Sequence, residues 1–153
     1  KKIVPMPRTR KPLVALALPL LLCLGCAVAP TPRSARSAAL VRSAQTFTHA
    51  LRWQRFRQCG RYVAPEIQEV FRQRIVDAED SLRITDTELI DVDWPEDSIA
   101  ATIVVKMRWI ELPSVVERSA TVEQRWEDRT QEGWLLSKME VTGGRGDAPL
   151  DIL

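Results

Sequence analysis

Few of the 153 residues could carry acid–base or metal chemistry. His49 is the only histidine, Tyr62 is the only tyrosine, and there are three cysteines. A structural zinc site takes about four Cys, His or carboxylate ligands, and one histidine with one free cysteine cannot supply them. The sequence also lacks a Gly-rich phosphate loop and a nucleophile motif. We therefore expect no catalytic residue, no metal and no cofactor.

The N-terminal residues have the pattern of an export signal. The first 25 residues carry five basic side chains and no acidic one, and residues 13–24 are uncharged. A basic start, a short apolar stretch and a small residue form the secretory pattern. Twelve residues rise only about 18 Å as a helix, against a bilayer core of roughly 30 Å. An uncleaved span extending to Ala29 remains the alternative, and the true start is either Lys1 or Met6.

The apolar stretch ends in Cys23-Leu24-Gly25-Cys26. Gly25 and Cys26 resemble the lipobox of bacterial lipoproteins, although Cys23 and Leu24 differ from that family's usual residues. The resemblance implies cleavage between Gly25 and Cys26, and a diacylglyceryl group on the Cys26 thiol. Ala27 follows, where an aspartate tends to retain such proteins at the inner membrane, so the resemblance implies the outer membrane, facing the periplasm. An ordinary signal peptide is the alternative.

The remaining cysteine, Cys59, has no evident partner. A mature chain beginning at Cys26 contains only these two cysteines, and lipid on Cys26 leaves Cys59 unable to form a disulfide within the chain. Because Cys59 falls in a predicted helix, we expect a small buried residue and not a nucleophile.

The candidate ligand pocket lies on the predicted strands. Gln124 alternates with Val122 and Trp126 on an apolar strand face, and a buried polar side chain needs a hydrogen-bonding partner or a ligand. The predicted pocket residues are Gln124, Trp126, Trp109, Met107 and Tyr62. The alternative is that the aromatic residues and Met107 simply fill the core.

Two periodicities predict the elements that would position these residues. Helical spacing runs from Ala38 towards Gly60, which we expect to cap the helix, and again from Pro65 to Ala78. Alternation with a period of two begins after Ser81 and predicts four strands, at 84–94, 99–109, 116–126 and 134–141.

Two details of strand geometry follow from the same alternation. In the first strand it places Ile84, Asp86 and Glu88 on one face. The apolar faces of the second and third strands meet when the numbers of paired residues add up to an odd number. A short loop at Glu111–Ser114 would then set Arg108 opposite Glu117, which would be a favourable cross-strand pair.

The predicted fold class is α+β, with two or three N-terminal helices packed on a curved, mostly antiparallel four-stranded sheet. The segments ALRW at 50–53, YVAPE at 62–66, QRW at 124–126 and GW at 133–134 resemble the nuclear transport factor 2-like superfamily, which implies a cone-shaped roll. That superfamily includes isomerases and dehydratases that work inside the cone.

The predicted organisation has four parts. Residues 1–25 are a signal peptide, 26–37 a lipidated N-terminus and tether, 38–141 the α+β domain, and 142–153 a flexible tail. Pro30 and Pro32 favour an extended tether.

The balance of basic and acidic side chains limits the classes of partner that the domain could bind. From residue 26 onward there are 17 basic and 20 acidic side chains, so we expect no nucleic-acid partner. A basic cluster on the predicted helices fits a protein partner or a solvated face; its residues are Arg52, Arg55, Arg57 and Arg61.

These observations favour a lipoprotein of the cell envelope, held on the membrane by its lipid. Its small domain would bind or scaffold an envelope protein without catalysis, and its ligand is unknown. Two alternatives remain open: a small-molecule pocket protein or isomerase- or dehydratase-like enzyme, and an uncleaved single-span envelope scaffold.

Overall fold

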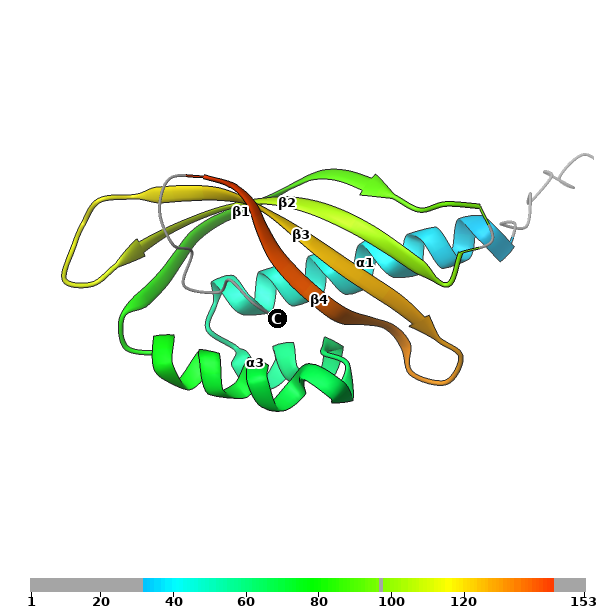
Figure 1. The fold of residues 1–153 in the computed structure, drawn as a ribbon, viewed down its shortest axis with the longest axis horizontal. Coiled ribbons are helices and arrows are strands. Elements are labelled where there is room, and N and C mark those ends of the chain that lie inside the picture. The colour runs from blue at the N-terminus through cyan, green and yellow to red at the C-terminus, as the bar shows by residue number, and fades with distance from the viewer. Residues whose placement is uncertain (1–31, 97, 145–153) are drawn as a thin grey trace, which may run out of the picture. The chain divides into compact units, whose positions relative to one another are not determined.

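The computed structural model describes residues 32–96 and 98–144 (Figure 1). Helices precede strands, so the fold is α+β, as predicted from the sequence. The elements in order are α1 (Pro32–Arg52), α2 (Phe56–Cys59), a 3-10 turn η1 (Gly60–Tyr62), α3 (Pro65–Ala78), β1 (Leu82–Asp93), β2 (Ala100–Glu111), β3 (Arg118–Arg129) and β4 (Gly133–Gly144). None of the described helices is long and apolar enough to cross a bilayer. The predicted signal peptide and Cys26 lie outside the described residues.

The four strands form one antiparallel sheet in the order β1-β2-β3-β4. Each strand therefore pairs with its neighbour in sequence, which short hairpin connections allow. The helices lie on one side of this twisted sheet, with α1 running beneath the strands and α3 below it (Figure 1). The apolar face of the sheet is the face that they cover.

One hydrophobic core joins the helices to that face of the sheet. Phe47 of α1 stands edge-on to Trp126 of β3, with their ring centroids 5.9 Å apart. Phe47 also contacts Phe71 of α3, at 6.0 Å between centroids. Aromatic pairs at such separations contribute beyond the area they bury, so Phe47 links all three layers.

The register between β2 and β3 differs from the predicted one. Arg108 lies opposite Ser119, and the predicted pair with Glu117 is wrong. The connecting loop spans residues 112–117, two residues more than the predicted loop at 111–114. A shift of two residues preserves the faces, so the apolar sides of the two strands still meet, as at Val105 opposite Val122.

The predicted common face of Ile84, Asp86 and Glu88 is also wrong. The pairing of β1 with β2 shifts between Ile84 and Asp86, so Thr85 is an extra residue in β1. A β-bulge of this kind reverses which face the following residues occupy. Ile84 is buried in the core, whereas Asp86 lies on the opposite face, beside Arg108.

The domain begins earlier than predicted. Residues 32–37 belong to α1 and not to an extended tether. A proline fits the first turn of a helix because the N–H it lacks has no partner there, which is why Pro32 starts this helix and does not block it. Two contacts attach this first part of α1 to the sheet. The Arg36 side chain pairs with Asp128 of β3 at 2.7 Å, and the Arg36 carbonyl accepts a hydrogen bond from Trp134 Nε1 of β4 at 3.2 Å.

The first helix also ends earlier than predicted, at Arg52 and not at Gly60. The chain reverses at Gln54, which adopts a left-handed φ of 53°. The Gln54 amide donates to the carbonyl of Leu82 at 3.1 Å, which ties this turn to the start of the sheet. Gly60 has a φ of −56° and lies in the right-handed region, so it is not a left-handed cap.

The last strand runs three residues into the predicted tail. β4 ends at Gly144, whose φ is +150°, and a Cβ there would lie 2.7 Å from Ala120 Cβ. Only glycine fits this close approach of β4 to β3 without a shift. The rest of the predicted tail, residues 145–153, lies outside the described residues.

Candidate functional site

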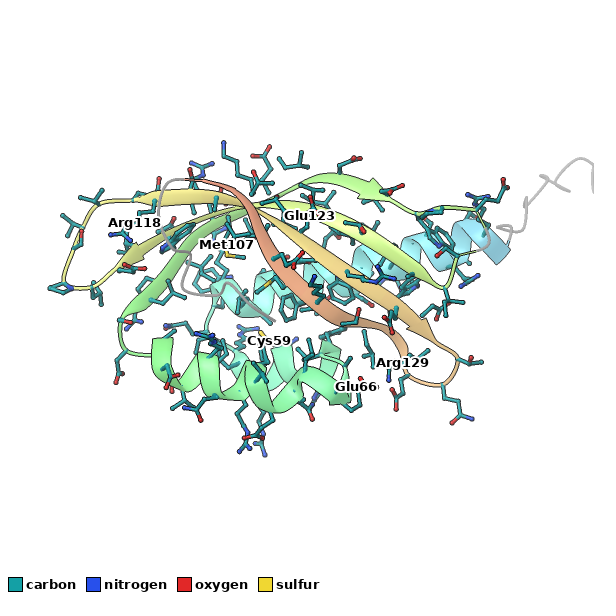
Figure 2. The ribbon with its side chains drawn as sticks, viewed as in Figure 1. Cys59, Glu66, Met107, Arg118, Glu123 and Arg129 are labelled. Atoms are coloured by element: carbon teal, nitrogen blue, oxygen red, sulfur yellow. The ribbon has the colours of Figure 1, made fainter. Side chains whose placement is uncertain are left out.

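Four of the five predicted pocket residues lie on the concave face of the sheet and are buried. Met107 (Figure 2), Trp109, Gln124 and Trp126 each have an exposed fraction of 3% or less. None of them lines the cavities of about 270, 380, 440 and 620 Å³ that described residues form. The structure therefore brings these four side chains together as core, and this favours the alternative view of the aromatic residues and Met107.

The amide of Gln124 has partners inside that core. Its Oε1 accepts a hydrogen bond from Trp126 Nε1 at 3.2 Å, and its Nε2 lies 3.9 Å from the sulfur of Met139. A buried polar group with such partners needs no ligand. Gln124 thus positions the Trp126 indole within the core.

Tyr62 and Trp109 differ from Gln124 and Trp126 in their surroundings. Tyr62, in η1, is half-buried and packs against the edge of the core. The indole nitrogen of Trp109 is buried and has no hydrogen-bond partner among the described residues.

Cys59 is fully buried on α2 (Figure 2), as predicted from the sequence. Burial raises the pKa of its thiol to about 12, because an apolar surrounding disfavours the thiolate. Its Sγ lies 3.8 Å from the carbonyl oxygen of Phe47, to which the S–H donates. The thiol stays protonated at neutral pH and is a poor nucleophile.

A cleft of about 270 Å³ lies between α1 and the first two strands. Its apolar lining comes from Ala44, Leu89 and Val105. Polar side chains complete it, among them Gln45, Thr48, His49, Arg52 and Thr87. The cleft contains the only histidine of the chain.

Arg52 is the charged group of the cleft. Its Nη1 lies 3.4 Å from Oδ1 of Asp86, and the other oxygen of Asp86 accepts a closer hydrogen bond from Arg108 at 2.9 Å. Two arginines thus share one carboxylate, which leaves this corner with a net positive charge. The imidazole of His49 lies beside the ring of Trp53, with 6.2 Å between centroids.

The cleft combines an apolar lining with one charged side chain, that of Arg52. An apolar floor with a positive group at one side suits an amphiphilic anion. Among the described residues, no carboxylate hydrogen-bonds to the His49 imidazole. Within residues 32–96 and 98–144 no group of three or more His, Cys, Asp or Glu side chains could hold a metal ion.

Sequence reasoning missed the cleft because strand alternation does not predict it. The bulge at Thr85 moves Thr87 to the concave face. A second register shift, between Leu89 and Asp91, reverses the faces again further along β1. The sequence contains one weak indication of the cleft, since His49 and Arg52 lie three residues apart and therefore share a helix face.

No family model and no curated protein matches this chain. Four chains of solved structures match this chain, and two of them are as follows. The solution structure of RPA3114, a SEC-C motif containing protein from Rhodopseudomonas palustris, is 13% identical and matches 70% of this chain and 88% of its own, with a TM-score of 0.55. The intermembrane space region of the chloroplast protein ARC6 is 13% identical and matches 71% of this chain and 96% of its own, with a TM-score of 0.49. At this identity the first likeness concerns the fold alone, and the second carries no argument.

Proposed function

We propose that this chain is a lipoprotein of the cell envelope, anchored by lipid on Cys26, whose α+β domain binds or scaffolds a partner on the periplasmic side. The observation that carries the proposal is Gly25-Cys26 at the end of the uncharged run 13–24, behind five basic side chains. This combination is the export pattern followed by the two lipobox residues.

The state of Cys59 supports this reading of Cys26. A buried thiol with a pKa near 12 is unsuited to acylation or to disulfide exchange with Cys26. We therefore expect no disulfide between Cys59 and Cys26. Because each buried methylene contributes about 0.8 kcal/mol and one acyl chain gives only marginal binding, two or three chains would hold the protein stably.

The start of α1 limits how far the domain could lie from the membrane. Only residues 27–31 separate Cys26 from Pro32, the first residue of α1. The six Cα–Cα steps from Cys26 to Pro32 span at most about 22 Å when fully extended. Near the start of α1, the Arg33 guanidinium lies over the Trp94 ring, 5.6 Å from its centroid. Tryptophan and arginine both suit the headgroup region.

Membrane fractionation with labelled palmitate tests the anchor. The wild-type chain should incorporate palmitate and sediment with membranes, and Cys26→Ser should lose the label and keep an unprocessed mass. Cys23→Ser is the matched control and should behave as wild type. Label that persists in Cys26→Ser would overturn the proposal. An unprocessed, unlabelled wild-type chain in the membrane would instead support the single-span alternative.

The cleft between α1 and β1 favours a second candidate function, the binding of a small amphiphilic anion. We expect the domain to bind and not to catalyse. Titration of the full chain with hexanoate, followed by amide chemical shifts, should perturb residues around Arg52 and His49. The variant Arg52→Gln should weaken this response, while Arg42→Gln, an exposed arginine of α1 outside the cleft, should not. Equal responses in both variants would exclude this function.

A further inference from the structure

A groove on the far side of the helices is unlike the rest of the surface. Two cavities of about 380 and 440 Å³ adjoin there and share Phe56, Arg57 and Glu79. The smaller and more apolar of the two lies between α2 and α3, with the buried side chains of Phe71 and Ile75 in its lining.

The groove exposes apolar surface that nothing in the described chain covers. Val76 lines it and keeps 62% of its surface exposed. Phe71 is 3% exposed and also contacts Phe47, so the lining is continuous with the rigid core. A concave apolar site with a rigid lining typically binds a side chain inserted by a partner.

The lining of the 440 Å³ cavity has a net positive charge, because it contains three arginines and one carboxylate, that of Glu79. Arg55, Arg57 and Arg61 line its cavities and are exposed. None of the three has a carboxylate partner within 4.0 Å among the described residues. Arg72 is different because it pairs with Glu69. The free arginines are therefore available to a negatively charged ligand.

We infer that this groove, formed by α2, η1 and α3, binds an acidic amphipathic segment of a partner protein. Apolar side chains of that segment enter beside Phe56 and Val76, and its carboxylates pair with Arg55, Arg57 and Arg61. This is the helix-in-groove mode of recognition with charge complementarity at one end. The inference gives the proposed binding domain its partner and so rests on the binding part of the proposed function, but not on the lipid anchor.

A protein segment fits this groove better than a lipid surface does. A bilayer presents a broad, flat face, whereas this apolar surface is recessed between two helices. The groove also follows the C-terminal end of α1, a helix of 21 residues. That helix is about 31 Å long, which sets the groove at the opposite end of α1 from the end that the anchor would hold.

Selection from a random peptide library displayed on phage tests the inference. The bait is the full chain held in neutral phosphatidylcholine nanodiscs. Enriched peptides should combine Asp or Glu with spaced Leu, Phe or Ile. Their affinity should fall about tenfold or more in Val76→Glu and in Arg57→Glu, as expected for a central apolar contact and an interfacial charge.

Matched variants separate the groove from general effects. Val70→Glu changes another exposed valine of α3, outside the groove, and Arg42→Glu reverses an exposed arginine of α1. Both should bind the selected peptides as wild type does. No enrichment, enrichment of peptides without acidic residues, or equal binding by Val76→Glu and Val70→Glu would overturn the inference. Binding of phosphatidylglycerol vesicles that Val76→Glu and Arg57→Glu abolish, without any peptide binding, would assign the groove to lipid. Palmitate on Cys26 is measured separately, so failure here leaves the anchor intact.

Discussion

Arg129 at the end of β3 binds Glu66 in the first turn of α3 through both of its terminal nitrogens. The Nη1–Oε1 distance is 2.8 Å and the Nη2–Oε2 distance is 3.0 Å (Figure 2). These hydrogen bonds lower the pKa of the Glu66 carboxyl below its ordinary 4.5. The pair is a bidentate contact between the helical layer and the sheet.

The pair should make stability depend on acid pH. Because the folded pKa of Glu66 is lowered, its contribution is complete above pH 4.5 and is lost as the pH falls through the lowered pKa. In a carboxyl NMR titration, Arg129→Gln should raise the Glu66 midpoint towards 4.5. Arg125→Gln, on the same strand, should leave it unchanged. An unchanged midpoint in Arg129→Gln would show that the contact is not populated in solution.

Gln124 should matter for stability and not for a ligand. Gln124→Leu removes the acceptor of a fully buried indole N–H, which costs about 1–3 kcal/mol in the free energy of unfolding. Urea denaturation measures this loss, with Gln45→Leu, an exposed glutamine of α1, as the control. Unchanged stability in Gln124→Leu would show that the Gln124 amide does not stabilise the core.

The two adjacent glycines at the end of β4 should respond differently to alanine. Gly144→Ala places a Cβ 2.7 Å from Ala120 and should destabilise the fold by about 1–3 kcal/mol, as overpacking does. Gly143→Ala meets Thr121 only at an ordinary 3.8 Å and is the control. Thermal or urea unfolding of both variants checks this, and equal losses would contradict the register of β4 on β3.

The Cys59 thiol should be unreactive until the domain opens. In the double variant Cys23→Ser, Cys26→Ser it is the only thiol left. Because its pKa is raised to about 12, reaction with a disulfide reagent at pH 8 should be at least ~100-fold slower than in denaturant. Absorbance of the released thiolate gives both rates. Similar rates would mean that Cys59 is accessible in the folded protein.

The order of elements was predictable because periodicity reports local geometry. Helical spacing before Ser81 and alternation after it predict the α+β order, and Pro65 marks the start of α3 as expected. The buried faces of β2 and β3 also follow directly, since their residues alternate without interruption.

The start of α1 and the faces of β1 were not predictable in the same way. Proline breaks a helix or begins one, and the choice at Pro32 depends on Arg36 meeting Asp128, which lies 92 residues away. The bulge at Thr85 depends on how β1 twists against β2 and leaves no mark in composition. The cleft beside His49 depends on that bulge, so local patterns could not reveal it.

The central claim is that Cys26 carries the lipid that anchors the domain. The most direct measurement is the intact mass and N-terminal fragmentation of the native mature protein. The account predicts a chain that begins at Cys26 and carries a diacylglyceryl group on that residue. A mature chain that begins at any other residue, or an unmodified sulfur at Cys26, would contradict it.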